Sequence, residues 1–146
     1  MRLSDLQTKE IINMTTGKRL GLIIDVIINA EGNIKSLILE EKKMNDEEYM
    51  EIAYQEALKA LKHDDVPIGC IIVKDDQIIA RAYNQREYLN QTYGHAEMLA
   101  IEEACKKIER WRLDECTLYT TLEPCLMCSG AIIQSHIQRV VYGASD

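Results

Sequence analysis

One pattern of metal-binding side chains constrains the fold of this chain more than any other feature. It consists of His95 and Glu97, followed later in the sequence by Pro124, Cys125 and Cys128. One imidazole and two thiolates can bind a single metal ion, and three protein ligands leave the fourth position of a tetrahedral site to water. A structural zinc site usually has four protein ligands, with its cysteines in two close pairs. The pattern therefore favours a catalytic zinc site.

The spacing within the pattern indicates that both halves lie at the starts of helices. Cys125 and Cys128 are three residues apart, so their thiols point the same way from one helix start. The N-terminus of a helix and a bound metal both favour the thiolate form. Glu97, two residues from His95, can take a proton from the metal-bound water and deliver it elsewhere. Taken singly, these residues could be core cysteines, a structural histidine and a carboxylate that matches a helix dipole, but their combination favours zinc.

Length and composition bound the broad class of the protein. The 146 residues correspond to about one domain with a substantial core, and 47% hydrophobic and 28% charged residues are ordinary for a soluble globular protein. No apolar run approaches the roughly 18 residues of a membrane span, and the N-terminus shows no secretory signal. The five cysteines show no disulfide framework. We therefore expect a protein of the reducing cytoplasm, without a membrane segment.

Charge is distributed unevenly along the chain. The net charge of −7 argues against broad, non-specific binding of nucleic acid. Residues 1–43 carry seven Lys or Arg and six Asp or Glu, whereas residues 44–146 carry ten and eighteen. The net charge therefore changes from +1 to −8 between these segments. This change predicts a domain boundary near residue 43.

Residues 1–43 are predicted to form a small all-β segment. Apolar runs alternate with turn sequences, in the order 11–14, 15–18, 20–28, 30–33 and 34–39. The motifs that carry a resemblance are Leu3-Ser4-Asp5-Leu6, Gly17-Lys18-Arg19-Leu20-Gly21, Asp25-Val26 and Gly32-Asn33-Ile34. In these motifs the segment resembles the first half of a PRC-barrel domain. Three strands cannot close a barrel, so a β-meander packed on its neighbour is the alternative.

Residues 44–146 are predicted to form a mixed α/β sheet flanked by helices. Asn45 can cap a helix, Glu48 completes a capping box, and apolar positions at helical spacing continue until His63. Those positions are Tyr49, Ile52, Ala53, Ala57, Leu58 and Leu61. The later predicted elements are strands at 66–73, 78–83, 115–121 and 138–142, helices from 95 and over 125–134, and a polar loop over 84–93. This β-β-α-β-α-β order implies an α/β fold.

Several motifs give residues 44–146 a specific resemblance to one family. Besides the metal-binding pattern they are Glu56-Ala57, Val66-Pro67-Ile68-Gly69, Ala82-Tyr83-Asn84, His95-Ala96-Glu97-Met98, Trp111-Arg112-Leu113, Thr121-Leu122-Glu123-Pro124-Cys125 and Arg139-Val140-Val141-Tyr142-Gly143-Ala144. In these motifs the segment resembles the bacterial tRNA-specific adenosine deaminases, which have a cytidine-deaminase-like fold. The metal-binding pattern is also similar to the signature of zinc-dependent nucleobase deaminases.

The resemblance implies a function and a set of site residues. The implied reaction is hydrolytic deamination of adenosine to inosine at the wobble position of a tRNA anticodon loop, by a homodimer with one zinc ion per protomer. The implied zinc ligands are His95, Cys125 and Cys128, the implied proton shuttle is Glu97, and the implied substrate-binding residues are Asn84, Ala96 and Pro67. The alternatives are a deaminase of free cytosine, guanine or a nucleoside, and an inactive or structural zinc-binding fusion fragment.

Other reactive or aromatic residues are expected in packing or surface roles. The cysteines expected to be buried free thiols are Cys70, Cys105 and Cys116. His63 and His136 are expected to be solvated, and Trp111 is expected to pack at a helix exit, with base stacking as the alternative. The densest basic cluster is Lys106, Lys107, Arg110 and Arg112, which suits either a solvated helix end or a phosphate-facing patch.

The second segment departs from the resembled family in two places. Leu126 stands where proline is frequent, and the family continues beyond the position of Asp146 with further helix and basic residues. With a net charge of −8 over residues 44–146, we expect the chain to bind zinc but to bind RNA weakly and with a steep salt dependence.

Overall fold

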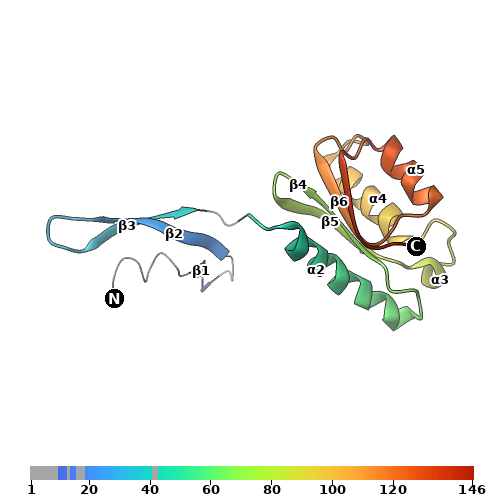
Figure 1. Cartoon of the computed structure of the whole chain (residues 1–146), viewed down its shortest axis with the longest axis horizontal. Coiled ribbons are helices and arrows are strands. Elements are labelled where there is room, and N and C mark those ends of the chain that lie inside the picture. The colour runs from blue at the N-terminus through green and yellow to red at the C-terminus, as the bar shows by residue number, and fades with distance from the viewer. Residues whose placement is uncertain (1–9, 13, 16–18, 41–42) are drawn as a thin grey trace. The chain divides into compact units, whose positions relative to one another are not determined.

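The chain divides into two compact units, residues 1–43 and 44–146. Figure 1 shows the computed structural model, which describes residues 10–12, 14–15, 19–40 and 43–146. Each unit has a β-sheet of its own. Among the described residues, no helix combines the length and the apolar character needed to cross a membrane.

The first unit contains a three-stranded antiparallel sheet with the order β1-β2-β3. Its strands are β1 (Glu10–Ile12), β2 (Arg19–Ile28) and β3 (Ile34–Glu40). The strands predicted at 20–28 and 34–39 are confirmed, and the turn between them contains Gly32 at φ +83°, a conformation that favours glycine. Of the predicted first strand and the turn after it, residues 13 and 16–18 lie outside the described residues.

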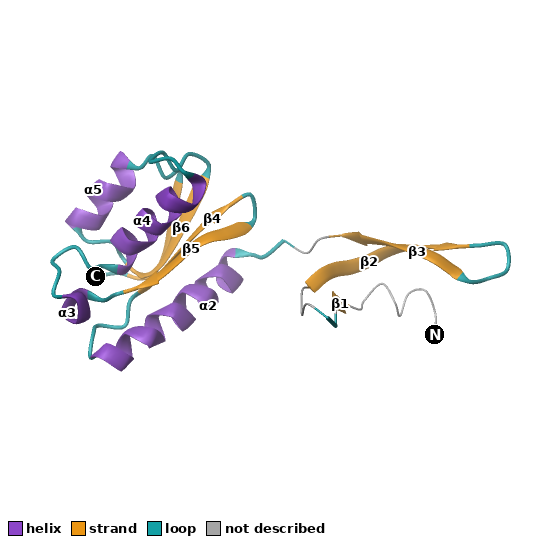
Figure 2. Ribbon diagram, turned by 180° about the vertical axis from the view of Figure 1, so that it is seen from behind, coloured by secondary structure: helices purple, strands orange, loops and turns teal. Residues whose placement is uncertain are grey.

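The second unit is a three-layer α/β structure with helices on both faces of a four-stranded sheet (Figure 2). Its strands are β4 (Gly69–Lys74), β5 (Gln77–Tyr83), β6 (Cys116–Leu122) and β7 (Arg139–Ala144). Its helices are α2 (Asp46–Ala57), the 3₁₀ helix η1 (Leu58–His63), α3 (Arg86–Leu89), α4 (Ala96–Ile108) and α5 (Leu126–Gln134). The helix α2 covers one face of the sheet, whereas α4 and α5 cover the other.

The strand order in this sheet is β5-β4-β6-β7. The strand β4 pairs antiparallel with β5 and β6, and β6 pairs parallel with β7. A two-residue turn, Asp75 and Asp76, joins β4 to β5, and both residues have the positive φ that a type I′ hairpin turn requires. The parallel pair β6 and β7 is connected through α5. This connection places the start of α5, and with it Cys125 and Cys128, just beyond the carboxyl end of β6.

Side chains of β4 alternate between two apolar cores. Cys70 and Ile72 belong to the core shared with α4 and α5, whereas Ile71 and Val73 belong to the core shared with α2. The side chains of Cys70, Ile71 and Ile72 are completely buried. A strand that is covered on both faces has a continuous apolar run instead of alternating polar positions. The strand β4 is therefore the centre of the unit.

The helix α2 begins where the sequence predicts but ends earlier. Asn45 is its N-cap residue, and the capping box with Glu48 is present. After Ala57 the chain continues as 3₁₀ helix, and the tighter turn moves the last predicted core positions to the surface. Leu58 and Leu61 are 38% and 55% exposed, so the prediction that both face the core is wrong.

The segments on either side of the β4–β5 hairpin also differ from the prediction. The strand β4 begins at Gly69, three residues later than predicted. The predicted polar loop contains the short helix α3. The backbone N–H groups of Glu87 and Tyr88 in this helix donate to the buried carboxylate of Asp65, at 2.8 and 3.1 Å. This cap satisfies N–H groups that a short helix cannot pair internally.

A polar network joins the start of α2 to β7. The Arg139 guanidinium donates to both carboxylate oxygens of Asp46, at 2.8 and 2.5 Å, and the Tyr119 hydroxyl donates to the same carboxylate at 2.8 Å. The hydrogen bonds from Arg139 and then from Tyr119 lower the pKa of Asp46 to about 2. Burial, followed by the bond to Asp46, raises the pKa of Tyr119 to about 12. The network therefore stabilises the ionised carboxylate and the neutral phenol together.

Candidate active site

The metal-binding pattern lies at the starts of two helices, as the sequence predicts. His95 is the N-cap residue of α4 and Cys125 is the N-cap residue of α5, both with extended backbone. Cys128 lies in the first turn of α5 and is fully buried. The positive ends of two helix dipoles therefore point toward one place.

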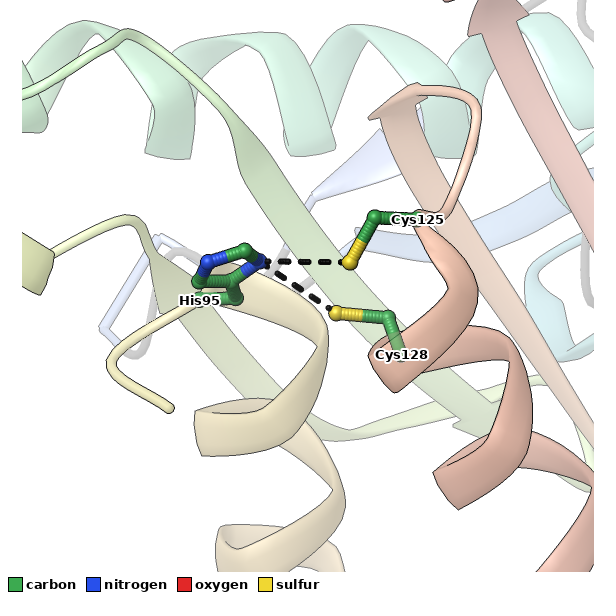
Figure 3. Close-up of side chains that lie close together, drawn as sticks. All are labelled: His95, Cys125 and Cys128. Atoms are coloured by element: carbon green, nitrogen blue, oxygen red, sulfur yellow. Dashed lines mark hydrogen bonds between the residues drawn. The ribbon is translucent and has the colours of Figure 1, made fainter. Parts of the chain in front are cut away.

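The three predicted ligands are within reach of one ion. In the part of the chain that the structure describes, His95, Cys125 and Cys128 are the one group of three or more suitable side chains, with all donor atoms within 4.8 Å of one another. Figure 3 shows Nδ1 of His95 facing both sulfurs, 3.6 Å from Sγ of Cys125 and 3.5 Å from Sγ of Cys128. Zinc bonds of about 2.0 Å to nitrogen and 2.3 Å to sulfur separate such atoms by about 3.5 Å in a tetrahedral site. The donor set and its spacing therefore fit zinc.

Glu97 lies directly beside this group and is only 3% exposed. Its Oε2 accepts a hydrogen bond from the Cys128 thiol at 3.5 Å, and its Oε1 accepts one from the Thr120 hydroxyl at 3.3 Å. Oε2 thus faces the metal-binding group, whereas Oε1 is hydrogen-bonded to a residue of the strand β6. A carboxylate in this place can exchange a proton with whatever occupies the fourth position around an ion.

Burial favours the protonated thiol at this site. Burial, followed by the nearby Glu97 carboxylate, raises the pKa of the Cys128 thiol well above its usual value. The same two causes raise the pKa of the Cys70 thiol on β4. Burial and the start of α5 thus act in opposite directions on Cys128, since the helix dipole favours the thiolate. Zinc would reverse this balance and displace the thiol proton.

The segment that leads into His95 forms a closed loop. The backbone N–H of Gln85 donates to the carbonyl of Gly94 at 2.9 Å, which joins the two ends of the loop. A Cβ at Gly94 would lie 3.0 Å from Cα of Arg86, so glycine allows α3 to approach the residue before His95 closely. His95 therefore follows a loop whose two ends are joined by a backbone hydrogen bond.

The three implied substrate-binding residues have different surroundings. Asn84 is 6% exposed, and its side-chain amide donates to the carbonyl of Val66 at 3.2 Å. Ala96 is fully buried in the first turn of α4, which leaves its backbone as the part that a substrate could meet. Pro67 is exposed in the segment before β4. The roles of these residues toward a substrate stay predictions.

Two buried polar residues, Thr120 and Asp65, were not identified from the sequence as candidates for a role near the site. Thr120 is fully buried in β6 and bonds Glu97, and Asp65 is 3% exposed and caps α3. Threonine is common in strands, so nothing in the local pattern distinguishes Thr120. The one feature of the sequence that could have pointed to Thr120 is its place in the strand that closely precedes Cys125. Asp65 has the sequence context of a helix end, which hides its role as a cap.

The predictions for the remaining cysteines and the basic cluster are met in part. Cys70 and Cys116 are fully buried free thiols, whereas Cys105 is only partly buried. Lys106 and Arg112 are exposed, and each forms an ion pair with an acidic side chain. Each of these two cations is thus paired with a nearby carboxylate on the surface, and the choice between a solvated helix end and a phosphate-facing patch stays a prediction.

Two aromatic groupings on the surface differ from the sequence-based expectation. The ring of His63 stacks on Tyr88 at 3.9 Å and lies parallel to Tyr83 at 6.3 Å between ring centroids, so it packs on tyrosines instead of being freely solvated. Trp111 is 62% exposed, and its ring lies 5.6 Å from that of the exposed His136. The expected packing of Trp111 at the helix exit is therefore limited to surface contacts.

Two family profiles match the chain. The profile described as the cytidine and deoxycytidylate deaminase zinc-binding region matches residues 43–144, and the PRC-barrel domain profile matches residues 1–84. The second match extends past the first unit into α2, β4 and β5 of the second unit. The resemblance to a PRC-barrel domain and to the zinc-dependent nucleobase deaminase signature is thereby confirmed.

Curated relatives of the chain carry the name tRNA-specific adenosine deaminase. The protein from Bacillus subtilis is 52% identical over 101 residues, which are 69% of this chain and 63% of the relative. The protein from Aquifex aeolicus is 46% identical over 103 residues, which are 70% of this chain and 68% of the relative. The chain thus spans slightly less than two thirds of the Bacillus relative.

Solved structures with this fold support the same grouping. A structure from work on A-to-I editing by tRNA:A34 deaminases at the wobble position of transfer RNA is 45% identical, with a TM-score of 0.66 over 67% of this chain and 71% of that chain. Guanine deaminase from Bacillus subtilis is 40% identical, with a TM-score of 0.68 over 70% of this chain and 66% of that chain. The predicted cytidine-deaminase-like fold is confirmed. The chain therefore belongs to the family of the cytidine and deoxycytidylate deaminase zinc-binding region, and its N-terminal part belongs to the PRC-barrel domain family.

Proposed function

We propose that this protein catalyses the zinc-dependent hydrolytic deamination of adenosine to inosine at the wobble position of a tRNA anticodon loop. The observation that carries the proposal is the ligand group His95, Cys125 and Cys128 with a buried acid beside it. The chain containing this group is 52% identical to a tRNA-specific adenosine deaminase over 101 residues. Its identity to the solved guanine deaminase is lower, at 40%.

His95, Cys125 and Cys128 would hold one zinc ion per protomer. Zinc bound there would keep its fourth position for water and lower the pKa of that water to about 7. The two thiols lose their protons on binding, and the positive ends of α4 and α5 offset part of the resulting negative charge. Because the ligands sit at helix starts, their positions relative to Glu97 are fixed by the two helices.

Glu97 would move the protons of the reaction. Its Oε2 lies 3.5 Å from the Cys128 sulfur, faces the metal-binding group and can accept a proton from water. The same carboxyl group then delivers this proton to the adenine ring nitrogen, and afterwards it passes the second proton of the former water, from the oxygen now on C6, to the amino group. The oxygen of water ends on C6, and the amino group leaves as ammonia, so atoms and protons balance.

An anticodon loop suits such a buried site. The target base has to leave any stack before it can enter, and an unpaired loop base does so at little cost. Asn84, Ala96 and Pro67 are proposed to contact the nucleoside. We further propose that residues 44–146 are the catalytic domain of a cytoplasmic homodimer, and that residues 1–43 are a partial PRC-barrel-like segment.

The test is inosine formation in a short anticodon stem-loop incubated with the purified full chain. Zinc is measured in the same sample by elemental analysis, and sedimentation gives the oligomeric state. Inosine at the wobble position in the wild type, and none in a Glu97→Gln control that keeps the ligands, is the expected result. A fully zinc-loaded chain that forms no inosine would contradict the proposal.

Deamination of free guanine is a second candidate. The TM-score of 0.68 to guanine deaminase, against 0.66 to the structure from the tRNA deaminase work, is the observation that favours it. Xanthine formed from guanine by the same preparation, with no inosine in the stem-loop, would select this reaction. Bound zinc without turnover of either substrate, or of cytosine and cytidine, would indicate a structural zinc-binding fragment.

A further inference from the structure

Thr120 is a buried polar residue whose hydroxyl meets the proposed proton shuttle. It is completely buried in β6, where its backbone is paired with Cys70 of β4 at the centre of the sheet. The hydroxyl donates a hydrogen bond of 3.3 Å to Oε1 of Glu97. The side chain of Thr120 therefore connects the sheet to the carboxylate of Glu97.

The two oxygens of Glu97 have different partners. Oε1 accepts from Thr120, and Oε2 accepts from the thiol of Cys128 in the metal-binding group. The last torsion of a glutamate side chain has a broad energy minimum, so a partner on one oxygen is needed to fix the direction of the other. We propose that Thr120 is a positioning residue that holds Oε1 of Glu97 and thereby keeps Oε2 facing the metal-binding group.

The next residue in the strand provides a contrast. The Thr121 hydroxyl accepts a hydrogen bond of 3.1 Å from the backbone N–H of Gly69, at the start of β4. Adjacent threonines on one strand point to opposite faces, so one hydroxyl supports the backbone and the other supports the acid. Valine has the shape of threonine without the hydroxyl, which makes Thr121→Val a matched control for Thr120→Val.

A double-mutant cycle in metal-free protein tests the contact without any need for activity. The variants are Thr120→Val, Glu97→Ala and their combination, and urea unfolding is followed by fluorescence of Trp111, the single tryptophan, in the second unit. We expect Thr120→Val to raise the unfolding equilibrium constant about tenfold beside the native glutamate, as for a lost hydrogen bond to a charged group. Combined with Glu97→Ala, it should not raise that constant. Equal effects in both backgrounds would overturn the proposal.

Turnover gives a second readout, which rests on the proposed function. Thr120→Val should lower kcat on the stem-loop by about 10- to 100-fold, with zinc content unchanged and KM within about threefold of the wild type. Thr120→Ser should restore most of kcat, and Thr121→Val should lower stability but leave kcat unchanged. An effect confined to KM, or no recovery with serine, would overturn the proposal. If the wild type forms no inosine, the proposed function fails, and the unfolding cycle alone decides whether Thr120 holds Glu97.

Discussion

Replacing Gly69 with alanine should force α2 away from the sheet and destabilise the second unit. Gly69 begins β4 at the point where α2 crosses it. A Cβ there would lie 2.0 Å from the carbonyl oxygen of Ala53 and 2.4 Å from the amide nitrogen of Ala57. Both of these atoms belong to the helix backbone, so no change of side-chain rotamer can relieve the overlap.

The expected destabilisation is at the upper end of the range for overpacked cores. Ordinary contacts between heavy atoms are about 3.5 Å long, so α2 would have to move by more than about 1 Å. The movement would stretch the 3.1 Å hydrogen bond from the Tyr49 hydroxyl to the Asp76 carbonyl, and the bonds of Asp46 to Arg139 and Tyr119. We expect Gly69→Ala to lower the free energy of unfolding by about 3 kcal/mol or more.

Urea unfolding followed by far-UV circular dichroism and by Trp111 fluorescence is the assay. Gly130→Ala in α5 is the control, because a Cβ at that position meets nothing within 4 Å. In this exposed helical position alanine should raise the free energy of unfolding by up to about 1 kcal/mol. If Gly69→Ala unfolds within about 1 kcal/mol of the wild type at an unchanged m-value, the reasoning about close helix packing is refuted.

The metal-binding group, its acid and the Asp46 network each give a further measurable expectation. Chelation should lower the thermal midpoint of the second unit, because an ion held by two helices stabilises only the folded state; an unchanged midpoint after verified zinc removal would contradict the site. Glu97→Gln should retain one zinc per chain and lose at least about a hundredfold in kcat, and a variant with most of the wild-type rate would exclude the shuttle role. Asp46→Asn should lower the free energy of unfolding by about 1 kcal/mol at neutral pH, a figure reduced for solvent screening because the Asp46 side chain is 43% exposed. Since folding lowers the pKa of Asp46 from 3.8 to about 2, this contribution is present above about pH 4 and is lost as the pH falls through about 2. The difference between the two proteins should therefore be smaller at about pH 3 than at about pH 7, and a constant difference would argue against the ionised pair.

Each half of the metal-binding group could be predicted because its own geometry depends on a short sequence spacing, whereas the meeting of the two halves was implied by the match to a known pattern. A CxxC pair at a helix start has one arrangement of its sulfurs, and the pairing of His95 with Glu97 places the acid beside the ligand. The capping box of Asn45 and Glu48 was predictable for the same reason, since both partners lie within one helical turn. Local rules of this kind need no knowledge of the rest of the fold.

The parts that could not be predicted depend on contacts between distant segments. The hydrogen bond from Thr120 to Glu97 joins a strand to a helix, and a strand sequence does not reveal which threonine meets a carboxylate. The helix α3 has only four residues, too few for a hydrophobic period, and its cap comes from Asp65 in another segment. Leu58 and Leu61 continue a helical period in the sequence, but the change to 3₁₀ geometry alters the face they occupy.

The sheet order β5-β4-β6-β7 also implies an order of events during folding. The β4–β5 hairpin closes through two residues, and hairpins of this kind form in about 1–10 μs. The strand β6 has to pair with β4 over long sequence separations, as in the pair Cys70 and Thr120, and such contacts form more slowly because a longer loop must close first. Because Cys125 closely follows β6 in the sequence, we expect it to reach His95 only after β6 has paired with β4. We therefore expect the metal ion to bind late in folding, after the strands of the second unit have reached their native order.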